Sequence, residues 1–389
     1  MDQLIGVFGI FILLAIAMAM SNNRVAISWR LVFWGLSLQL TFAIIILKTP
    51  IGIPFFGAID IFVKNLLSFS DAGSDFLFKS FGQNIVEAPL MNFAFRILPT
   101  LIFFSSLINV LYHLGVMQFL VKSTARIMQK TMGTSGSETL CISGNIFVGQ
   151  TEAPLLVQPF VSKMTNSELT AVMIGGFATV AGGVMAMYVS MLGNIDGIAG
   201  HLLAASIMSA PAALVVAKII YPETEESQTK GDLTISIKND DDNIMEALST
   251  GATNGMKLAA NVAAMLIAFV ATIAMVNAVL SLFGLSLEQI LGWIFSPLAW
   301  VMGVPWEEAY VVGSLMGKKL VLTELIAFGD LSTLISDNVL SERSAIISSY
   351  ALCGFANFAS IGIQLGGIGG IAPERRKDIA QLGLKTMFG

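Results

Sequence analysis

Apolar runs long enough to cross a lipid bilayer recur along this chain and constrain its fold more than any other feature. The first two cover residues 3–20 and 31–47, and a membrane-spanning helix needs about 20 residues. Only 12% of the 389 residues are charged, too few to cover the surface of a soluble domain. The sequence therefore predicts an all-α integral membrane protein and excludes a soluble enzyme, a disulfide-stapled secreted protein and a disordered chain.

Further spans are predicted near residues 94–114, 168–193, 199–220, 258–284 and 345–371. With the start of a last span after Pro373, they make about eight transmembrane helices, and we expect the chain to continue for about 20 apolar residues beyond Gly389. Charged residues interrupt the apolar stretches over 55–80, which favours an interfacial helix there. Basic clusters at 24–30, 122–130 and 375–377 fall on one side of this topology, which places that side in the cytoplasm and the N-terminus outside.

Two halves of the chain repeat the same motifs in the same order. The matched pairs are Leu114-Gly115 with Phe283-Gly284, Met132-Gly133 with Met302-Gly303, Thr151-Glu152 with Thr323-Glu324, and the Gly-Phe-Ala sequences at 176–178 and 354–356. An odd number of crossings separates the copies, so they form an inverted repeat, which is typical of secondary transporters. The predicted organisation is scaffold spans and an interfacial helix (1–115), a first transport repeat (116–221), a polar cytoplasmic linker (222–254), a scaffold span with an external helix (255–304) and a second transport repeat (305–389).

The segments that carry the threonine-glutamate pairs are too broken to span the membrane. Residues 133–163 consist of two short apolar arms around a tip that Pro154 closes. This pattern predicts a re-entrant helical hairpin, and its counterpart around Glu324 predicts a second. Helix ends at such tips leave backbone groups unpaired, which is tolerated at membrane depth where they line a cavity or bind a ligand.

Two glutamates within these segments need a compensating partner, since a carboxylate near the bilayer centre costs at least about 2.5 to 3.5 kcal/mol. Glu152 and Glu324 could be structural, paired with Lys318 or Lys319 or capped by backbone N–H groups, or they could accept hydrogen bonds from a polar substrate. The neutral polar side chains in apolar surroundings could join helices or contact the same ligand. These are Gln150, Thr151, Thr179, Asn357 and Ser360.

Three ordered motifs resemble the concentrative nucleoside transporter family. They are the sequence from Gly144 to Pro154, the segment from Gly317 to Phe328, and the segment from Cys353 to Gly362. The resemblance implies a homotrimer in the inner membrane, in which a mobile transport domain carries nucleosides past a fixed scaffold in an elevator-like movement. It also implies coupling to a sodium gradient or, in some bacterial members, to protons.

The resemblance further implies roles for individual residues. Gln150, Thr151 and Glu152 would hold the nucleobase with Val184 packed on it, while Glu324, Asn357 and Ser360 would hold the ribose with Phe355 nearby. Sodium would bind to Asn145, Thr179 and the carbonyls of Val148 and Val180. One departure is Thr323, which stands where the family usually has asparagine.

The sequence leaves other functions open beside sodium-driven nucleoside import. Proton coupling would use Glu152 or Glu324, a membrane-embedded hydrolase would use both as acid and base, and a passive channel would need no matched tips. The chain has no G-x-x-x-x-G-K-[ST] sequence for an ATPase of its own. A net charge of −5 provides no basic field for nucleic acid.

Overall fold

The computed structural model describes residues 2–49, 54–65, 67, 98–193, 195–230 and 241–389. Within them the fold is built of helices, as predicted, and one isolated bridge joins Ser135 to Lys230. The helices are α1 (Asp2–Ala19), α2 (Trp29–Lys48), α5 (Leu98–His113), α6 (Val116–Met132), α7 (Gly136–Asn145), α8 (Gln158–Val161), α9 (Asn166–Ala178), α10 (Gly182–Met191), α11 (Ile198–Ile220), α12 (Ile244–Leu280), α13 (Leu287–Val301), α14 (Trp306–Val321), α15 (Glu324–Ser336), α16 (Glu342–Leu352), α17 (Phe358–Ile371) and α18 (Arg376–Phe388).

Some of the apolar helices are long enough to cross a bilayer. Among the described residues, Trp29–Ile46, Asn166–Met191 and Ile198–Ile220 are long and apolar enough to cross a membrane, and two bent helix pairs raise the number of candidates from 3 to 5. The total of about eight spans therefore stays a prediction. Of the interfacial helix expected over 55–80, residues 54–65 are helical, and most of the rest lies outside the described residues.

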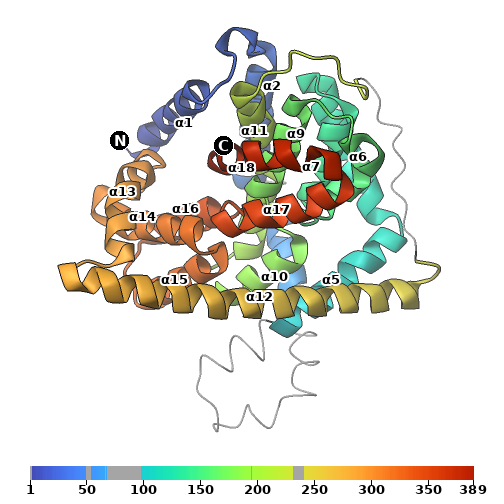
Figure 1. Cartoon of the computed structure of the whole chain (residues 1–389). Coiled ribbons are helices and arrows are strands. Elements are labelled where there is room, and N and C mark those ends of the chain that lie inside the picture. Colours follow the sequence, from blue (N-terminus) through green and yellow to red (C-terminus); the bar gives the residue numbers. More distant parts are fainter. Residues whose placement is uncertain (1, 50–53, 66, 68–97, 194, 231–240) are drawn as a thin grey trace.

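One predicted boundary needs correction. Helix α12 begins at Ile244, so the second part of the linker predicted over 222–254 is helical. The side chain of Asn243 accepts a hydrogen bond from the Glu246 N–H and caps the helix, and Glu246 favours the positive end of the helix dipole. The long α12 then runs across one side of the molecule and packs on α5 (Figure 1).

Glycines turn the chain at the matched corners of the two halves. Helix α5 bends by 76° into α6 after Gly115, and α12 bends by 82° into α13 after Gly284. Both glycines have φ near +70° to +80°, as does Gly133 at the end of α6, a conformation that costs other residues free energy. The sequence motifs that were paired by order thus occupy equivalent corners.

Two long helices are broken in the middle, and their breaks touch. Residues 179–181 separate α9 from α10, and residues 353–357 separate α16 from α17. At Gly354 the backbone has φ of +151°, and a side chain there would lie 2.8 Å from the carbonyl oxygen of Phe177. Only glycine allows this approach, so the polar ends of four half-helices gather in one region.

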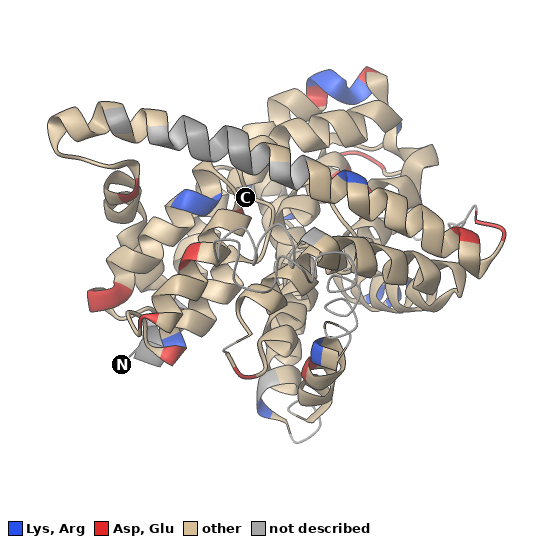
Figure 2. Cartoon of the chain, turned by 90° about the horizontal axis from the view of Figure 1, so that it is seen from below, with Lys and Arg blue, Asp and Glu red and all other residues tan. Residues whose placement is uncertain are grey.

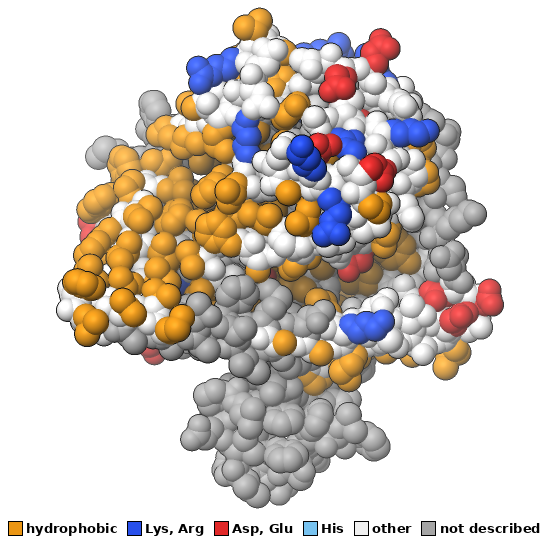
Figure 3. Space-filling model, viewed as in Figure 1, with side chains coloured by type: hydrophobic (Ala, Val, Ile, Leu, Met, Phe, Trp, Pro, Cys, Tyr) orange, Lys and Arg blue, Asp and Glu red, His pale blue; other side chains and the backbone are white. Residues whose placement is uncertain are grey.

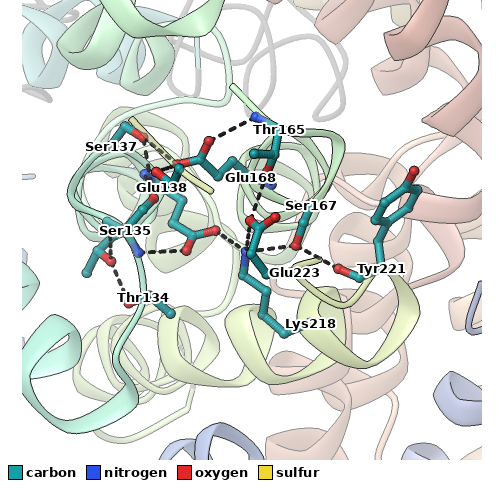
Figure 4. A network of polar contacts seen from close by, with 12 residues as sticks. Thr134, Ser135, Ser137, Glu138, Thr165, Ser167, Glu168, Lys218, Tyr221 and Glu223 are labelled. Carbon is teal, nitrogen blue, oxygen red and sulfur yellow. Dashed lines mark hydrogen bonds and ion pairs between the residues drawn. The ribbon is translucent and has the colours of Figure 1, made fainter. Parts of the chain in front are cut away.

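A buried polar network ties the linker to the helices beside it (Figure 4). Helices α7 and α9 both begin with a capping box, built on Glu138 and Glu168. Lys218 at the end of α11 pairs with Glu138 at 2.6 Å, and Ser227 of the linker donates to Glu168 at 2.5 Å. Further contacts come from Ser137, Thr165, Ser167, Glu223 and Thr229. Glu223, Ser227 and Thr229 therefore anchor this part of the linker to α7 and α9, while the residues between them are exposed.

The outer surface is suited to lipid. Acidic and basic residues are sparse over the ribbon (Figure 2). Hydrophobic side chains gather over α13 and α14 on the left of Figure 3, where Trp293, Ile294 and Trp306 are about 60% exposed. Patches of this extent on a chain with so few charges indicate contact with a membrane or with other apolar surfaces.

Candidate functional site

Glu324 lies at the centre of a buried set of hydrogen bonds. It is the first residue of α15, directly after the break that follows α14, and only 6% of it is exposed. Its carboxylate accepts from the Tyr188 hydroxyl and from Asn357 Nδ2, both at 2.9 Å. Two donors stabilise a carboxylate that would otherwise be costly to bury.

Asn357 connects this carboxylate to Ser360. The Asn357 side chain caps α17 by accepting from the Ser360 N–H at 2.9 Å, while its amide nitrogen reaches Glu324. Cap residues are favoured at this position because the first N–H groups of a helix have no partner within it. The break between α16 and α17 therefore places the side chains of Asn357 and Ser360 together at the start of α17.

Gln150 joins the same set from the first half of the chain. It follows α7, in the turn that leads to the short helix η4 (Ala153–Val157), and its Nε2 donates to Ser360 Oγ at 3.2 Å. Its Oε1 accepts from Gln364 Nε2 at 3.0 Å. We call the connected side chains the polar row: Tyr188, Glu324, Asn357, Ser360, Gln150 and Gln364. Four of the eight predicted substrate-binding residues belong to it.

Glu152 and Thr151 lie outside the polar row. Glu152 is exposed and lines a pocket between the turn after α7, helix α5 and helix α12, together with Asn109, Tyr112 and Asn254. Its carboxylate occupies the space that a side chain at residue 149 would need. Thr151 is half-buried and packs close to Gly367. The structure thus separates the two predicted carboxylates: one is buried between helices and one faces a pocket.

The two apolar residues of the predicted site share one hydrophobic cluster. Val184 is buried in the cluster that contains Tyr188, and Phe355 packs against it from the break between α16 and α17. Tyr188 also stacks on Phe328, with ring centroids 4.1 Å apart. This packing holds the Tyr188 hydroxyl toward Glu324.

Among the described contacts neither Lys318 nor Lys319 donates a hydrogen bond to Glu324, although the charge of Lys319 acts on that of Glu324. Lys318 forms its ion pair with Asp330 at 2.5 Å, and Lys319 Nζ donates to the Ala351 carbonyl at 3.0 Å. Pairing of Glu324 with Lys318 is thereby contradicted. The side chains that donate to Glu324 are a hydroxyl and an amide, and the backbone N–H of Glu324 also bonds to its carboxylate.

The predicted sodium ligands lie where the turn after α7 meets the break after α9. The Gly182 N–H donates to the Phe147 carbonyl at 2.9 Å and joins the two segments. Asn145 is fully buried, and neither of its amide atoms has a hydrogen-bond partner among the described residues. Thr179 donates its hydroxyl proton to the Gly175 carbonyl at 2.8 Å, which leaves its lone pairs available.

This donor set fits a hard monovalent cation. Amide, hydroxyl and carbonyl oxygens are the ligands that hard cations prefer, and a buried amide without partners is costly. Val148 and Val180, whose carbonyls complete the predicted set, are both buried. Among the described residues, no group of three or more histidine, cysteine or acidic side chains could hold a transition metal.

Tyr188 and Gln364 were missed from the sequence. Gln364 follows Ser360 by four residues and therefore lies on the helix face that Asn357 and Ser360 share. A polar residue on that face of an otherwise apolar helix was the signal that could have found it. Tyr188 follows Val184 by the same interval, but nothing in the sequence indicates that its hydroxyl meets residue 324.

Comparisons with known proteins agree over nearly the whole chain. Family models described as the N-terminus and the C-terminus of a Na⁺ dependent nucleoside transporter match residues 8–81 and 201–389, and one described as nucleoside recognition matches residues 94–195. An uncharacterized transporter of Haemophilus influenzae is 43% identical over 402 residues, which covers 100% of this chain and 94% of that protein.

Human sodium/nucleoside cotransporter 1 is 42% identical over 408 residues, and the chain spans 61% of its length. Among solved structures, CNTnw in an inward-facing substrate-bound state matches with a TM-score of 0.91 and 42% identity, covering 100% of this chain and 94% of that one. A variant of CNTnw in an outward-facing state matches with a TM-score of 0.90 and 41% identity.

Proposed function

Because the chain belongs to the Na⁺-dependent, or concentrative, nucleoside transporter family, we propose that it imports nucleosides by sodium symport. The resemblance seen in its sequence motifs is confirmed, and the family consists of transporters and not of enzymes. The hydrolase hypothesis is therefore set aside.

The polar row is the observation that carries the proposal. It presents an amide, a hydroxyl and a carboxylate side by side, deep within apolar helices, at the point where two broken spans meet. A carboxylate and an amide can accept from and donate to ribose hydroxyls, and a second amide can read a base edge. We assign the nucleobase to Gln150, Thr151, Glu152 and Val184, and the ribose to Glu324, Asn357, Ser360 and Phe355.

Sodium is the cargo that accompanies the nucleoside in this proposal. Asn145, Thr179 and the carbonyls of Val148 and Val180 would bind it, and the unpartnered amide of Asn145 supports this assignment. Asn145 ends α7, five residues before Gln150, so an ion bound there would hold the start of the turn that carries the base-reading amide. Binding of sodium and binding of nucleoside would then be coupled. Each ligand orders this segment, so the other ligand loses less conformational entropy when it binds.

Alternating access requires the site to move or to be uncovered from each side. We propose that residues 116–221 and 305–389 move as a unit, elevator-like, against a scaffold of residues 1–115 and 255–304. The inward- and outward-facing states of the CNTnw structures support such a movement. A homotrimer in the inner membrane, two re-entrant hairpins and an inverted repeat complete the proposal, and the matched glycine corners support the repeat.

Uptake of radiolabelled uridine into proteoliposomes, with sodium and proton gradients imposed separately, tests the function. We expect accumulation above the external concentration that depends on inward sodium and leaves the uridine intact. Replacement of sodium by choline at constant pH should abolish accumulation. Uptake that persists in choline and follows the proton gradient would overturn sodium coupling and favour Glu324 or Glu152 as the proton carrier. Equilibration without accumulation would point to a channel.

Thr179→Val provides a matched variant for the ion site. It keeps the side-chain volume and removes the hydroxyl, so we expect it to raise the sodium concentration needed for half-maximal uptake. Thr333→Val, at an exposed threonine of α15, is the control. An unchanged sodium dependence in Thr179→Val would remove this residue from the proposed ion site.

A further inference from the structure

Gln364 is a fully buried glutamine that the assigned site does not use. Its Nε2 lies 3.0 Å from Gln150 Oε1 and 3.0 Å from the carbonyl oxygen of Met173 on α9. Gly176 provides the room, because a side chain at that position would lie 2.7 Å from Gln364 Nε2 and 2.9 Å from Gln150 Cβ. Three segments distant in sequence therefore meet at this amide: α17 itself, α9 and the turn after α7.

The Met173 carbonyl fixes the direction of these hydrogen bonds, because a carbonyl oxygen can accept a hydrogen bond but cannot donate one. Gln364 must therefore turn its NH₂ group toward this oxygen. The same nitrogen also contacts Gln150, which must then offer its carbonyl oxygen. The NH₂ group of Gln150 is left to donate to Ser360 Oγ. A hydroxyl can donate or accept, so Ser360 alone would allow either orientation of the Gln150 amide.

We infer that Gln364 is a positioning residue that fixes the Gln150 amide in one orientation and thereby sets the preference between keto and amino nucleobases. This inference rests on the proposed function, in which Gln150 reads the base edge. Gln364 itself acts through Gln150 and through the backbone of α9.

The chemistry of the bases gives this orientation its consequence. Uracil presents a donor at N3 beside an acceptor at O4, whereas cytosine presents an acceptor at N3 beside an amino donor at N4. Hypoxanthine and adenine differ in the same way at N1 and the exocyclic group at C6. An amide has one donor side and one acceptor side. If the Gln150 amide is held in one orientation, it can form both hydrogen bonds with either the keto base or the amino base, but not with both. This holds when the two bases bind with their rings in the same place.

Transport kinetics of uridine, cytidine, inosine and adenosine in proteoliposomes test the inference. For the wild type we expect KM to differ between the keto and amino members of each pair on the order of tenfold, as for one misplaced buried hydrogen bond. Gln364→Leu removes the donor that orients Gln150, so the KM ratio should fall toward one, with KM rather than the maximal rate carrying the change.

Gln364→Glu should reverse the preference. The introduced carboxyl group can donate its proton to the Met173 carbonyl and accept from the NH₂ group of Gln150, which turns the amide around. This variant keeps a hydrogen-bonding group of the same size. It therefore still tests the inference if Gln364→Leu fails to insert into the membrane. Gln381→Leu and Gln381→Glu, at an exposed glutamine of α18, make the same chemical changes and should leave every KM ratio at its wild-type value.

The outcomes separate this inference from the proposed function. Uptake with equal KM values for keto and amino bases in the wild type overturns the inference and leaves nucleoside transport standing. Unchanged ratios in both variants at residue 364 do the same, because a purely structural glutamine would alter the amount of active protein and not its base preference. A wild type that takes up none of the four nucleosides overturns the proposed function, and the inference with it.

Discussion

At the scale of single residues, the buried carboxylate of Glu324 is defined by the donors around it. Tyr188 and Asn357 both donate to it at 2.9 Å. Glu324→Gln would turn an NH₂ group toward one of these donors, a loss of about 1 to 3 kcal/mol, and it would weaken the proposed ribose contacts. We expect the variant to insert but to lose most uridine uptake. Wild-type uptake would return Glu324 to a structural role.

Glu152→Gln is expected to lose most transport for a different reason. Its carboxylate faces a pocket and is free to accept from a substrate, so the substitution should raise KM for nucleosides without destabilising the fold. Thermal unfolding of the purified variant should match that of the wild type, whereas Glu324→Gln should unfold at a lower temperature. Equal destabilisation in both variants would contradict the separation of the two carboxylates that the geometry indicates.

At the scale of elements, the helix ends are held by charge as well as by packing. Lys218 is 4% exposed and Glu138 is 1% exposed, and their 2.6 Å ion pair joins the end of α11 to the start of α7. Lys218→Met would leave a buried carboxylate unpaired, at a cost of about 3 to 5 kcal/mol. We expect a clear drop in the thermal unfolding temperature, in contrast to Lys130→Met at an exposed position of α6.

The double variant Lys218→Met with Glu138→Gln separates charge from packing. Removing both charges relieves the unpaired carboxylate, so part of the lost stability should return. Stability that stays as low as in Lys218→Met would show that the methionine fails to pack, and that the ion pair is not what holds α11 to α7.

At the scale of the whole molecule, the proposed movement brings scaffold and transport unit past one another. Phe104 of α5 belongs to the proposed scaffold and Gly183 of α10 to the moving unit, and a side-chain Cβ at residue 183 would lie 3.9 Å from Phe104 Cβ. This separation suits a disulfide. Phe104→Cys with Gly183→Cys should lose uptake on oxidation and regain it on reduction, while each single variant should be insensitive to oxidant. Full uptake by completely cross-linked protein would exclude movement between these elements.

Local features of this fold could be predicted from the sequence because they depend on neighbouring residues. The long apolar runs predicted α2 and α11, and Pro154 predicted the interrupted segment after α7. The start of α12 at Ile244 was missed. The first turns of this helix are polar, so their composition resembles that of a linker, and only the capping residue Asn243 marks where the helix begins.

The set of residues around the site was predicted in part. Gln150, Glu324, Asn357 and Ser360 stood out since polar groups are costly in apolar helices, and these four do meet. Whether a given pair touches was a different question: Tyr188 and Glu324 lie 136 residues apart, and Gln150 and Gln364 lie 214 apart. Those contacts depend on how the two broken spans pack at Gly354 and Gly176. Sequence alone thus determined which groups must be satisfied within the membrane, and only the tertiary structure decided which partner satisfies each, because a hydrogen bond requires its two atoms to lie within about 3 Å of each other.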